Sequence, residues 1–225
     1  MSQQGYVIKP VQAEDKEEIM NLLQRTFFID EPLNQAIGLY NDGNCPELEE
    51  YCTESLPGDG WCFKAVDAEG NIVGVMINGI WPIKEAENGG DYLTMAEKCQ
   101  NHKFQKILYV LARREEGARL WEKFPDDNQV LDVKIAATDP NWRKRGIMNA
   151  LLEATEKVTK ERGIRILRMD TSSFYSAMSA ERLGFTCMYS APYTELKMDG
   201  RPLIVPEPPH VDDRVYVKIM FERKK

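Results

Sequence analysis

The most regular hydrophobic pattern lies in the second half of the chain. From residue 131 to 137 apolar side chains alternate with polar or small ones, which predicts a strand. From residue 147 to 162 apolar residues recur at every third or fourth position, which predicts a helix, and Gly163 is suited to end it. Residues 164–169 predict the next strand. The same criteria predict strands over residues 6–11, 62–66, 72–80, 185–190 and 215–222, and helices over residues 13–28, 47–55, 91–101, 103–124 and 176–183.

Proline and glycine mark the connections between these elements. Pro32 interrupts the first helical pattern, because the residue before a proline disfavours the helical conformation. Residues 67–71 predict a tight turn, and residues 88–90 and the proline-rich residues 203–210 predict loops. Helices inserted between strands of one sheet predict a three-layer α/β or α+β domain.

Composition and charge narrow the functional classes. The chain has 225 residues and a formal net charge of −7, which argues weakly against a nucleic-acid partner. We expect no secretory signal and no spanning helix, because no apolar run has the required length or flanks. The five cysteines are irregularly spaced, which favours reduced thiols and a cytoplasmic location.

A basic turn follows the strand at residues 131–137. It runs from Asp139 to Met148 and contains Arg143, Lys144 and Arg145 immediately before Gly146. A helix start exposes unpaired backbone N–H groups, and a glycine lets an anion approach them, so the turn is a candidate phosphate site. The alternative is an ordinary solvated basic turn. The glycine-rich motifs of dinucleotide folds and of nucleoside-triphosphate loops are absent from the sequence.

The order strand, Arg143-x-x-Gly146, long helix, strand and Leu183-Gly184-Phe185 resembles the GNAT superfamily of N-acetyltransferases. The resemblance covers roughly residues 130–189 and implies a mixed, mostly antiparallel central sheet flanked by helices. It also implies acetyl-CoA as co-substrate, with the turn on the pyrophosphate and the preceding strand paired to the pantetheine arm. Met148 departs from the family pattern, which has glycine or alanine there. The coenzyme-binding residues implied in this way are Ile135, Ala136, Ala137, Arg143, Lys144, Arg145, Gly146, Ile147 and Met148.

A narrower resemblance extends over nearly the whole chain. Residues 27–34, 47–51, 172–177 and 208–210 are similar, in this order, to segments of insect arylalkylamine N-acetyltransferases. The resemblance implies a single domain over residues 1–225 that acetylates dopamine, serotonin, tyramine or related amines. It places the coenzyme core at residues 130–190 and the elements of the amine pocket mainly at residues 20–60 and 190–215.

Glu31 is the candidate general base. A protonated amine has no free lone pair, so a base must take a proton before or during attack on the thioester. Glu31 follows an apolar helix end, where partial burial raises the pKa of a carboxyl group. From the residues alone an exposed acid at a helix end is the simpler interpretation. The resemblance implies the base, and Asp30 is the nearest rival.

Ser172 and Ser176 are the other candidate catalytic residues. They are four positions apart and share a face if the segment is helical. The resemblance implies hydrogen bonds to the amine or to the coenzyme sulfur, whereas the alternative is that one serine caps the following helix. Ala180 stands where much of the superfamily has a tyrosine acid, so another acid, or thiolate release without one, is required.

Pro32, Tyr51 and His210 are implied as amine-binding residues by the same resemblance. The alternatives are core packing for Tyr51 and a surface loop position for His210. Cys99 and His102 have a spacing seen in metal sites, but no second pair of ligands accompanies them, so we expect no metal.

Together these features predict direct acetyl transfer within a ternary complex, since no Cys–His pairing indicates an acyl-enzyme. We expect a small-molecule amine as the substrate of the protein, and we expect no nucleic-acid, membrane or obligatory protein partner. Other acceptors stay open: a polyamine, a hydrazine or a protein amine. A polyamine pocket should be acidic, whereas an arylalkylamine pocket should be apolar and aromatic. A coenzyme-binding module without catalysis is the remaining alternative.

Overall fold

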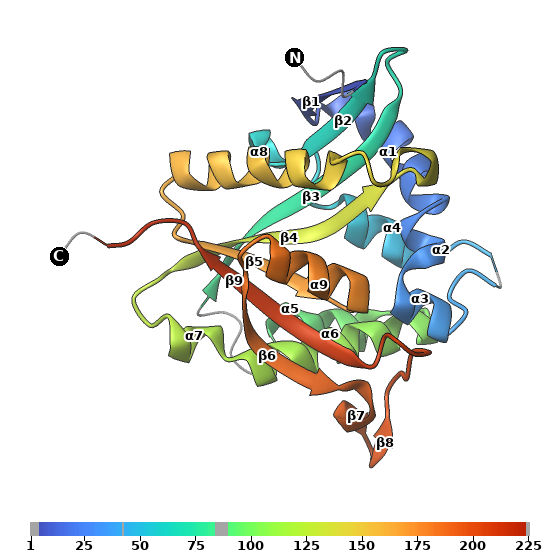
Figure 1. The fold of residues 1–225 in the computed structure, drawn as a ribbon. Helices are drawn as coiled ribbons and strands as arrows, with labels where there is room; N and C mark the ends of the chain where they lie inside the picture. Colours follow the sequence, from blue (N-terminus) through green and yellow to red (C-terminus); the bar gives the residue numbers. More distant parts are fainter. Residues whose placement is uncertain (1–4, 42, 84–89, 224–225) are drawn as a thin grey trace.

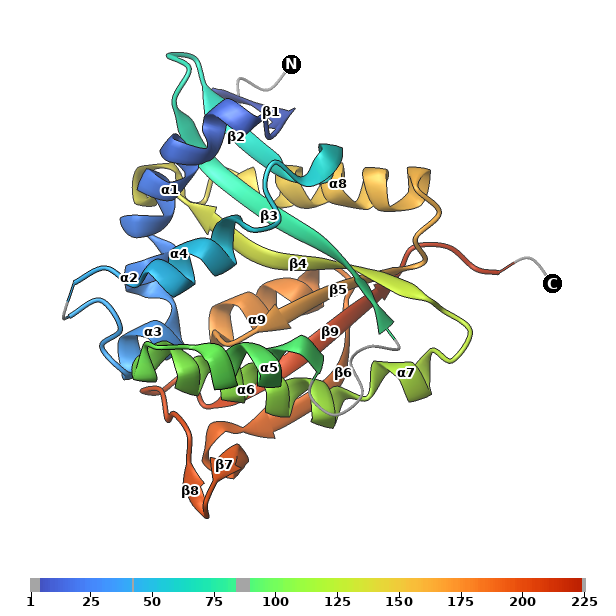
Figure 2. The same cartoon turned by 180° about the vertical axis from the view of Figure 1, so that it is seen from behind.

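A seven-stranded sheet runs through the molecule in the order β1-β2-β3-β4-β5-β9-β6 (Figures 1 and 2). The computed structural model describes residues 5–41, 43–83 and 90–223. Among these residues β4 and β5 form the one parallel pair, so the expected mixed, mostly antiparallel sheet is confirmed. The strands are β1 (Tyr6–Pro10), β2 (Phe63–Asp67), β3 (Ile72–Pro82), β4 (Gln129–Thr138), β5 (Ile166–Thr171), β6 (Thr186–Pro192) and β9 (Asp212–Ile219), with a separate hairpin of β7 (Lys197–Met198) and β8 (Arg201–Pro202).

Helices cover both faces of the sheet. Figure 1 shows α8 and α9 in front of it, and Figure 2 shows α1, α4, α5 and α6 on the opposite face. The α-helices are α1 (Lys16–Gln24), α2 (Phe27–Asp30), α3 (Pro32–Ala36), α4 (Pro46–Thr53), α5 (Gly90–Lys98), α6 (His102–Ala118), α7 (Leu120–Lys123), α8 (Ile147–Glu161) and α9 (Phe174–Arg182). Short 3₁₀ helices are η1 (Ala13–Asp15), η2 (Gly58–Gly60), η4 (Pro140–Trp142) and η5 (Tyr193–Glu195).

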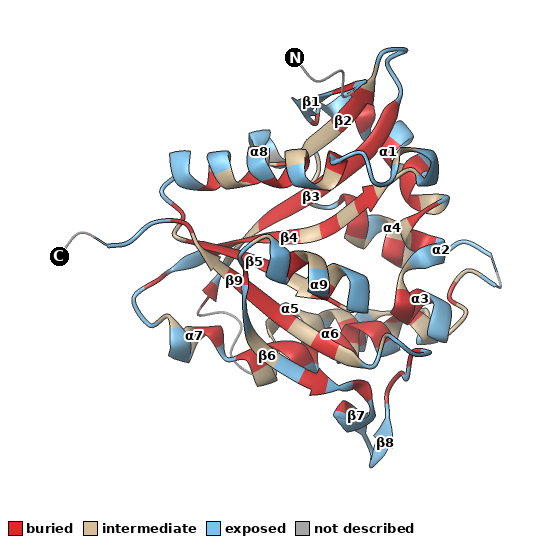
Figure 3. Ribbon diagram, viewed as in Figure 1, coloured by how far each residue is buried: buried red, intermediate tan, exposed pale blue. Residues whose placement is uncertain are grey.

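The burial of the strands follows from these two layers. β3 lies in the middle of the sheet, and its residues from Ile72 to Gly79 are all buried (Figure 3). β6 lies at the edge, and most of its residues are partly or fully exposed. α8 turns Ile147, Leu151 and Leu152 toward the sheet, because apolar residues spaced three to four apart share one helix face.

The centre of the sheet is split between β4 and β5. Their parallel pairing covers only Val130–Val133 and Ile166–Met169. On its other side β4 stays paired with β3 as far as Thr138, apart from a bulge that leaves Lys134 unpaired between Ile135 and Val133. From the bulge onward the backbone groups of β4 that point away from β3 therefore face a gap.

Several element boundaries differ from those predicted. The helix expected over residues 13–28 is divided, because Thr26 leaves the helical conformation and its hydroxyl donates to the Leu22 carbonyl oxygen at 2.6 Å. α9 begins at Phe174 rather than at residue 176. The region between β6 and β9 contains the short β7–β8 hairpin before the predicted loop. The loop predicted at residues 88–90 lies mostly outside the described residues, and Gly90 begins α5.

The described helices include none with both the length and the apolar character that a membrane crossing requires.

Candidate active site

A cavity of about 730 Å³ occupies the gap between β4 and β5. One wall is the stretch of β4 from Val133 to Thr138, and Met169 and Asp170 of β5 lie opposite it. Residues that are distant in the sequence complete the cavity: Thr26, Phe27, Asp30, Glu31, Pro32, Arg143, Lys144, Met148, Ser172, Ser173, Tyr175, Ser176, Ser179, Arg182 and Leu183. Three expected groups, the β4 stretch, the basic turn and the candidate catalytic residues, therefore meet in one cavity.

The cavity continues into a polar lobe of about 550 Å³ at the start of α8. Gly146 is the N-cap of α8, with φ +81°, and it has no side chain to accept from the N–H groups of the first turn. The first turn also contains no acidic residue. Arg143, Lys144 and Arg182 line the lobe and add positive charge. Free N–H groups, a helix dipole and cations together fit a phosphate group.

Arg145 and Arg143 of the basic turn each interact with another side chain. The Arg145 guanidinium stacks on the Trp142 ring, 4.6 Å from its centroid, and Arg145 lines neither the cavity nor the lobe. Arg143 donates to the Asp30 carboxylate at 2.5 Å, and both side chains are about half exposed. This ion pair joins α2 to the basic turn across the cavity.

Glu31 lies between α2 and α3, where the chain turns, and it lines the cavity. Its carboxylate caps α3 by accepting from the Asn34 backbone N–H at 2.7 Å. Burial raises the pKa of Glu31, while hydrogen bonds from the Ser172 side chain and from the Asn34 and Leu33 backbone oppose the shift. Asp30, its rival, is exposed and is held by Arg143. The geometry therefore favours Glu31 as the carboxylate that reaches the cavity interior.

The positions of Ser172, Ser173 and Ser176 relative to α9 differ from the expected arrangement. Ser173 is the N-cap of α9, and its hydroxyl accepts from the Tyr175 N–H at 3.2 Å. Ser172 precedes the helix, so it does not share a helix face with Ser176. Both nevertheless line the cavity, and Ser176 donates to the Ser173 carbonyl oxygen at 2.9 Å. Neither Ser172 nor Ser176 is the cap residue.

A network of buried ion pairs connects α6 with β5 and β9 next to the candidate catalytic residues. The Arg114 guanidinium on α6 pairs with both carboxylate oxygens of Asp213, at 2.6 and 2.8 Å, and with Asp170 at 3.1 Å. The Tyr193 hydroxyl lies 3.3 Å from Asp213 and 3.4 Å from the Ser172 carbonyl oxygen, to which it donates. The sequence analysis missed this network. The pair Arg168 and Asp170, which alternate within an apolar strand, was the signal that could have revealed it.

The implied amine-binding residues are not all in one place. Pro32 lines the cavity with Glu31. His210 lies near its rim, where its Nδ1 accepts from the Phe174 N–H at 3.1 Å and its ring packs edge-on against Tyr175. Tyr51 does not line this cavity. It lies in a second cavity, beside Tyr92 and under the Lys134 ammonium, which is 3.7 Å from the Tyr51 ring centroid.

α9 contributes cavity residues that the sequence analysis did not select. Ser179 and Arg182 line both the cavity and its polar lobe. With Ser176 they recur at intervals of three, which is the spacing of one helix face. Polar residues at this spacing were therefore the available signal. In the described part of the chain no three His, Cys, Asp or Glu residues are grouped so as to hold a metal ion.

No family model matches the chain. Solved structures do match it over nearly its whole length. An agmatine N-acetyltransferase is 25% identical, with 96% of this chain and 99% of that chain covered and a TM-score of 0.85. Arylalkylamine N-acetyltransferase 2 from Aedes aegypti is 25% identical over 96% and 99% of the two chains, with a TM-score of 0.84. The polyamine N-acetyltransferase of Drosophila melanogaster, which forms N-acetylagmatine, is 26% identical over 95% and 99%, with a TM-score of 0.84. The expected likeness to insect N-acetyltransferases is confirmed, and their acceptors fall into two chemical classes.

Proposed function

We propose that this chain, which has the fold of the GNAT N-acetyltransferases, transfers the acetyl group of acetyl-CoA to the amine of a small molecule. The observation that supports this most is the meeting of three features in one cavity. These are the unpaired edge of β4, the lobe with cationic side chains at Gly146 and the carboxylate of Glu31. A site that only bound an anion would need the lobe alone.

The coenzyme occupies the gap in the sheet. Its pyrophosphate lies in the lobe, where the N–H groups of α8, Arg143, Lys144 and Arg182 neutralise its charge. Its pantetheine arm has amide groups of its own, which pair with the free backbone groups of β4 at Ile135, Ala136 and Ala137. This placement directs the thioester toward the bulge at Lys134 and toward Ser172 and Ser176.

Glu31 acts as the general base. Its raised pKa makes the carboxylate a better proton acceptor than an ordinary glutamate, while the Ser172 hydroxyl and the Asn34 N–H hold its orientation. The neutral amine attacks the thioester carbonyl, and its nitrogen loses a proton to Glu31, directly or through water. Collapse of the tetrahedral intermediate breaks the C–S bond, and the products are the N-acetyl amine and coenzyme A thiol.

Ser176 is the hydroxyl that we assign to the sulfur side of the reaction. It lies on the first turn of α9 and lines the same cavity as Glu31. A hydroxyl donor there stabilises the departing thiolate without a tyrosine at position 180. Ser172, which acts on Glu31, belongs to the amine side.

Arylalkylamines such as dopamine, serotonin and tyramine are the acceptors that the sequence resemblance implies. The aromatic side chains around Tyr51 fit an aryl ring. A second acceptor class is favoured by carboxylates in the same cavity: amines with another positive charge, such as agmatine or a polyamine.

The test is release of coenzyme A thiol from acetyl-CoA in the presence of an amine panel. The panel holds arylalkylamines, diamines, agmatine, a hydrazine and a lysine peptide, and the product is identified by mass. We expect saturable thiol release with one class of small amine. Tight binding of coenzyme A without thiol release for any acceptor would instead identify a coenzyme-binding module and contradict the proposal.

A further inference from the structure

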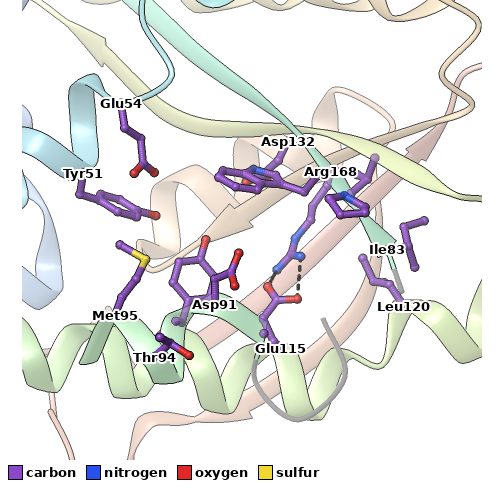
Figure 4. Close-up of a pocket in the computed structure, with 15 residues that line it drawn as sticks. Tyr51, Glu54, Ile83, Asp91, Thr94, Met95, Glu115, Leu120, Asp132 and Arg168 are labelled. Atoms are coloured by element: carbon purple, nitrogen blue, oxygen red, sulfur yellow. Dashed lines mark hydrogen bonds and ion pairs between the residues drawn. The ribbon is translucent and has the colours of Figure 1, made fainter. Parts of the chain in front are cut away.

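A second cavity, of about 330 Å³, lies on the face of the sheet covered by α5 and α6 (Figure 4). We name it the Asp132 cavity. Figure 4 shows Asp132 and Arg168 reaching into it from the sheet, with Glu115 opposite them on α6. Its lining residues are Tyr51, Glu54, Trp81, Pro82, Ile83, Gly90, Asp91, Tyr92, Thr94, Met95, Glu115, Leu120, Val130, Asp132 and Arg168. The lining includes Tyr51, which the sequence resemblance implies as an amine-binding residue.

Asp132 is a buried residue whose carboxylate has an oxygen, Oδ1, without a hydrogen-bond partner among the described residues. Asp132 is 6% exposed, and no described residue donates a hydrogen bond to its Oδ1. Arg168 is its neighbour across the β4–β5 pair, but that guanidinium donates to Glu115 and to Asp170. Leaving such a group unpaired is costly in a folded protein, so a buried orphan carboxylate indicates a ligand.

The charges around the cavity do not balance. Glu54 pairs with the Lys134 ammonium and Glu115 pairs with Arg168. These pairs leave Asp132 and the exposed Asp91 without a described cation on the lining. Burial, and then the charge of Asp170, raise the pKa of Asp132 to about 7, although the charges of Arg168 and Arg114 act to lower it. Both guanidinium groups donate their hydrogen bonds to other carboxylates, so Asp132 lacks a directly bonded positive partner. A cation that enters the cavity would supply it.

The other walls are aromatic. Trp81, Tyr92 and Tyr51 line the cavity, and the Trp81 Nε1 is buried without a partner among the described residues. Cations are attracted to aromatic faces, and the Lys134 ammonium already lies over the Tyr51 ring. Because the described carboxylates are not grouped to chelate a metal ion, the matching ligand is an organic cation.

The cavity between β4 and β5, in which we place the coenzyme, is called the coenzyme cavity. The Asp132 cavity lies next to it along β4 and β5. Lys134 and Asp170 line the coenzyme cavity, and each is two residues beyond a residue of the Asp132 cavity. Two residues of a strand span about 7 Å. Arg168 and Asp170 both face α6, since Glu115 and Arg114 of that helix are their partners. A short, flexible amine can therefore have one end in each cavity.

We propose that the Asp132 cavity binds a cationic group at the far end of the acceptor, a guanidinium or a second ammonium, while the reacting amine lies beside Glu31. The inference rests on the proposed function, because it names the acceptor class of the same site. The Asp132 carboxylate accepts hydrogen bonds from the cation, and the aromatic walls cover its faces. A neutral aryl ring in this position would leave Asp132 buried and unpaired.

The experiment compares primary amines that carry a guanidinium, a second ammonium, an uncharged alkyl end or an aryl ring at the far end. Thiol release is measured with agmatine, putrescine, butylamine and phenethylamine for the wild type, Asp132→Asn and Asp199→Asn. For the wild type we expect agmatine or putrescine to have a higher kcat/KM than butylamine and phenethylamine. Asp132→Asn should reduce the ratio of kcat/KM for the dication to that for phenethylamine by about 10–100-fold, through loss of a charge-assisted hydrogen bond. Asp199→Asn removes the same charge from an exposed position that lines neither cavity, and it should change this ratio by less than about fivefold.

A wild type that prefers phenethylamine, or an Asp132→Asn variant that loses all acceptors equally, would overturn the inference. The wild-type preference is informative even if the variant fails to fold. Calorimetry of agmatine binding to the protein saturated with coenzyme A separates this inference from the proposed function. If no amine is acetylated, agmatine binding that Asp132→Asn abolishes still supports the cavity assignment. Absence of agmatine binding in the wild type contradicts it.

Discussion

At the scale of single residues, Glu31 combines two tasks that usually compete. Its carboxylate caps α3, and a cap is stabilised by a negative charge at the helix start. The same carboxylate is buried enough for its pKa to rise. The backbone N–H groups of the cap hold it in one orientation, which is the preorganisation that a general base needs. The cap accounts for an acidic residue immediately before Pro32, and we propose that the same carboxylate acts as the base.

The first prediction concerns the basicity of Glu31. Glu31→Gln keeps the shape and the cap acceptor but cannot take a proton, so kcat/KM should fall by about 10²–10⁴-fold. Because burial raises the pKa of Glu31, the acidic limb of the wild-type kcat/KM profile should lie at higher pH than for an ordinary glutamate, and activity should be lost as the pH falls through that limb. Coenzyme affinity, measured by calorimetry, should barely change.

Ionisation of the amine shapes the same profile, so an acceptor of lower pKa is the control. More of it is already neutral, and it should recover part of the rate lost in Glu31→Gln. Near-normal turnover of every accepted amine by this variant would exclude Glu31 as the base and would direct attention to Asp30 or His210.

A second prediction concerns Ser172 and Ser176. If Ser172, beside Glu31, and Ser176, on the sulfur side, both act in the same transition state, the effects of the two alanine substitutions on kcat should be less than additive in the double variant. Ser173→Ala is the matched control, since Ser173 is the helix cap, and it should reduce the melting temperature with a smaller effect on kcat. Strictly additive losses of kcat, each with a lower melting temperature, would assign the serines to structure.

At the scale of elements, local signals predicted more than long-range ones. The strand at β4, the basic turn and α8 follow from alternation, from Pro140 and from Gly146, all of which act on their own neighbours. The gap beside β4 could not be predicted, because it depends on where β5 stops pairing. The division of the first helix at Thr26 depends on one side-chain hydrogen bond to Leu22. The position of Tyr51 outside the coenzyme cavity depends on the placement of α4, which contacts α1.

The third prediction belongs to the basic turn. Arg143→Ala should weaken binding of acetyl-CoA by about 10–100-fold, because it removes a charge-assisted hydrogen bond to phosphate. It should hardly change the melting temperature, since the exposed ion pair of Arg143 with Asp30 contributes little to stability. Asp30→Asn is the matched partner: it frees Arg143 and removes a negative charge near the lobe, so coenzyme binding should tighten. Calorimetry that shows unchanged affinity for both variants would remove Arg143 from the coenzyme site.

At the scale of the whole molecule, buried ion pairs join α6 to β5 and β9, which form one side of the split sheet. Arg114 reaches Asp213 on β9 and Asp170 on β5, and Glu115 reaches Arg168. A purely apolar helix could fill the same space. The charged version fixes which strand positions face the helix, and it places Tyr193 and hence the Ser172 carbonyl at the edge of the site. Stability and active-site geometry therefore depend on the same buried residues.

A fourth prediction tests this network. Arg114→Met leaves Asp213 and Asp170 buried without their cation, so the free energy of unfolding in urea should fall by about 3–5 kcal/mol. The double variant Arg114→Met with Asp213→Leu removes both members of the buried pair and should recover part of this loss. A single variant as stable as the wild type would show that Arg114 is not required to balance these carboxylates.

The open side of β4 also determines how its amide hydrogens exchange with solvent. Between Lys134 and Thr138, the amides that point toward β3 are hydrogen-bonded, whereas those that point into the gap have no strand to protect them. A backbone without a partner exchanges rapidly even in the middle of a sheet. In deuterated water this short segment should therefore exchange faster than the part of β4 paired with β5, and coenzyme A should slow it selectively. Equal exchange along the whole of β4, with and without coenzyme A, would show that the coenzyme does not complete the sheet.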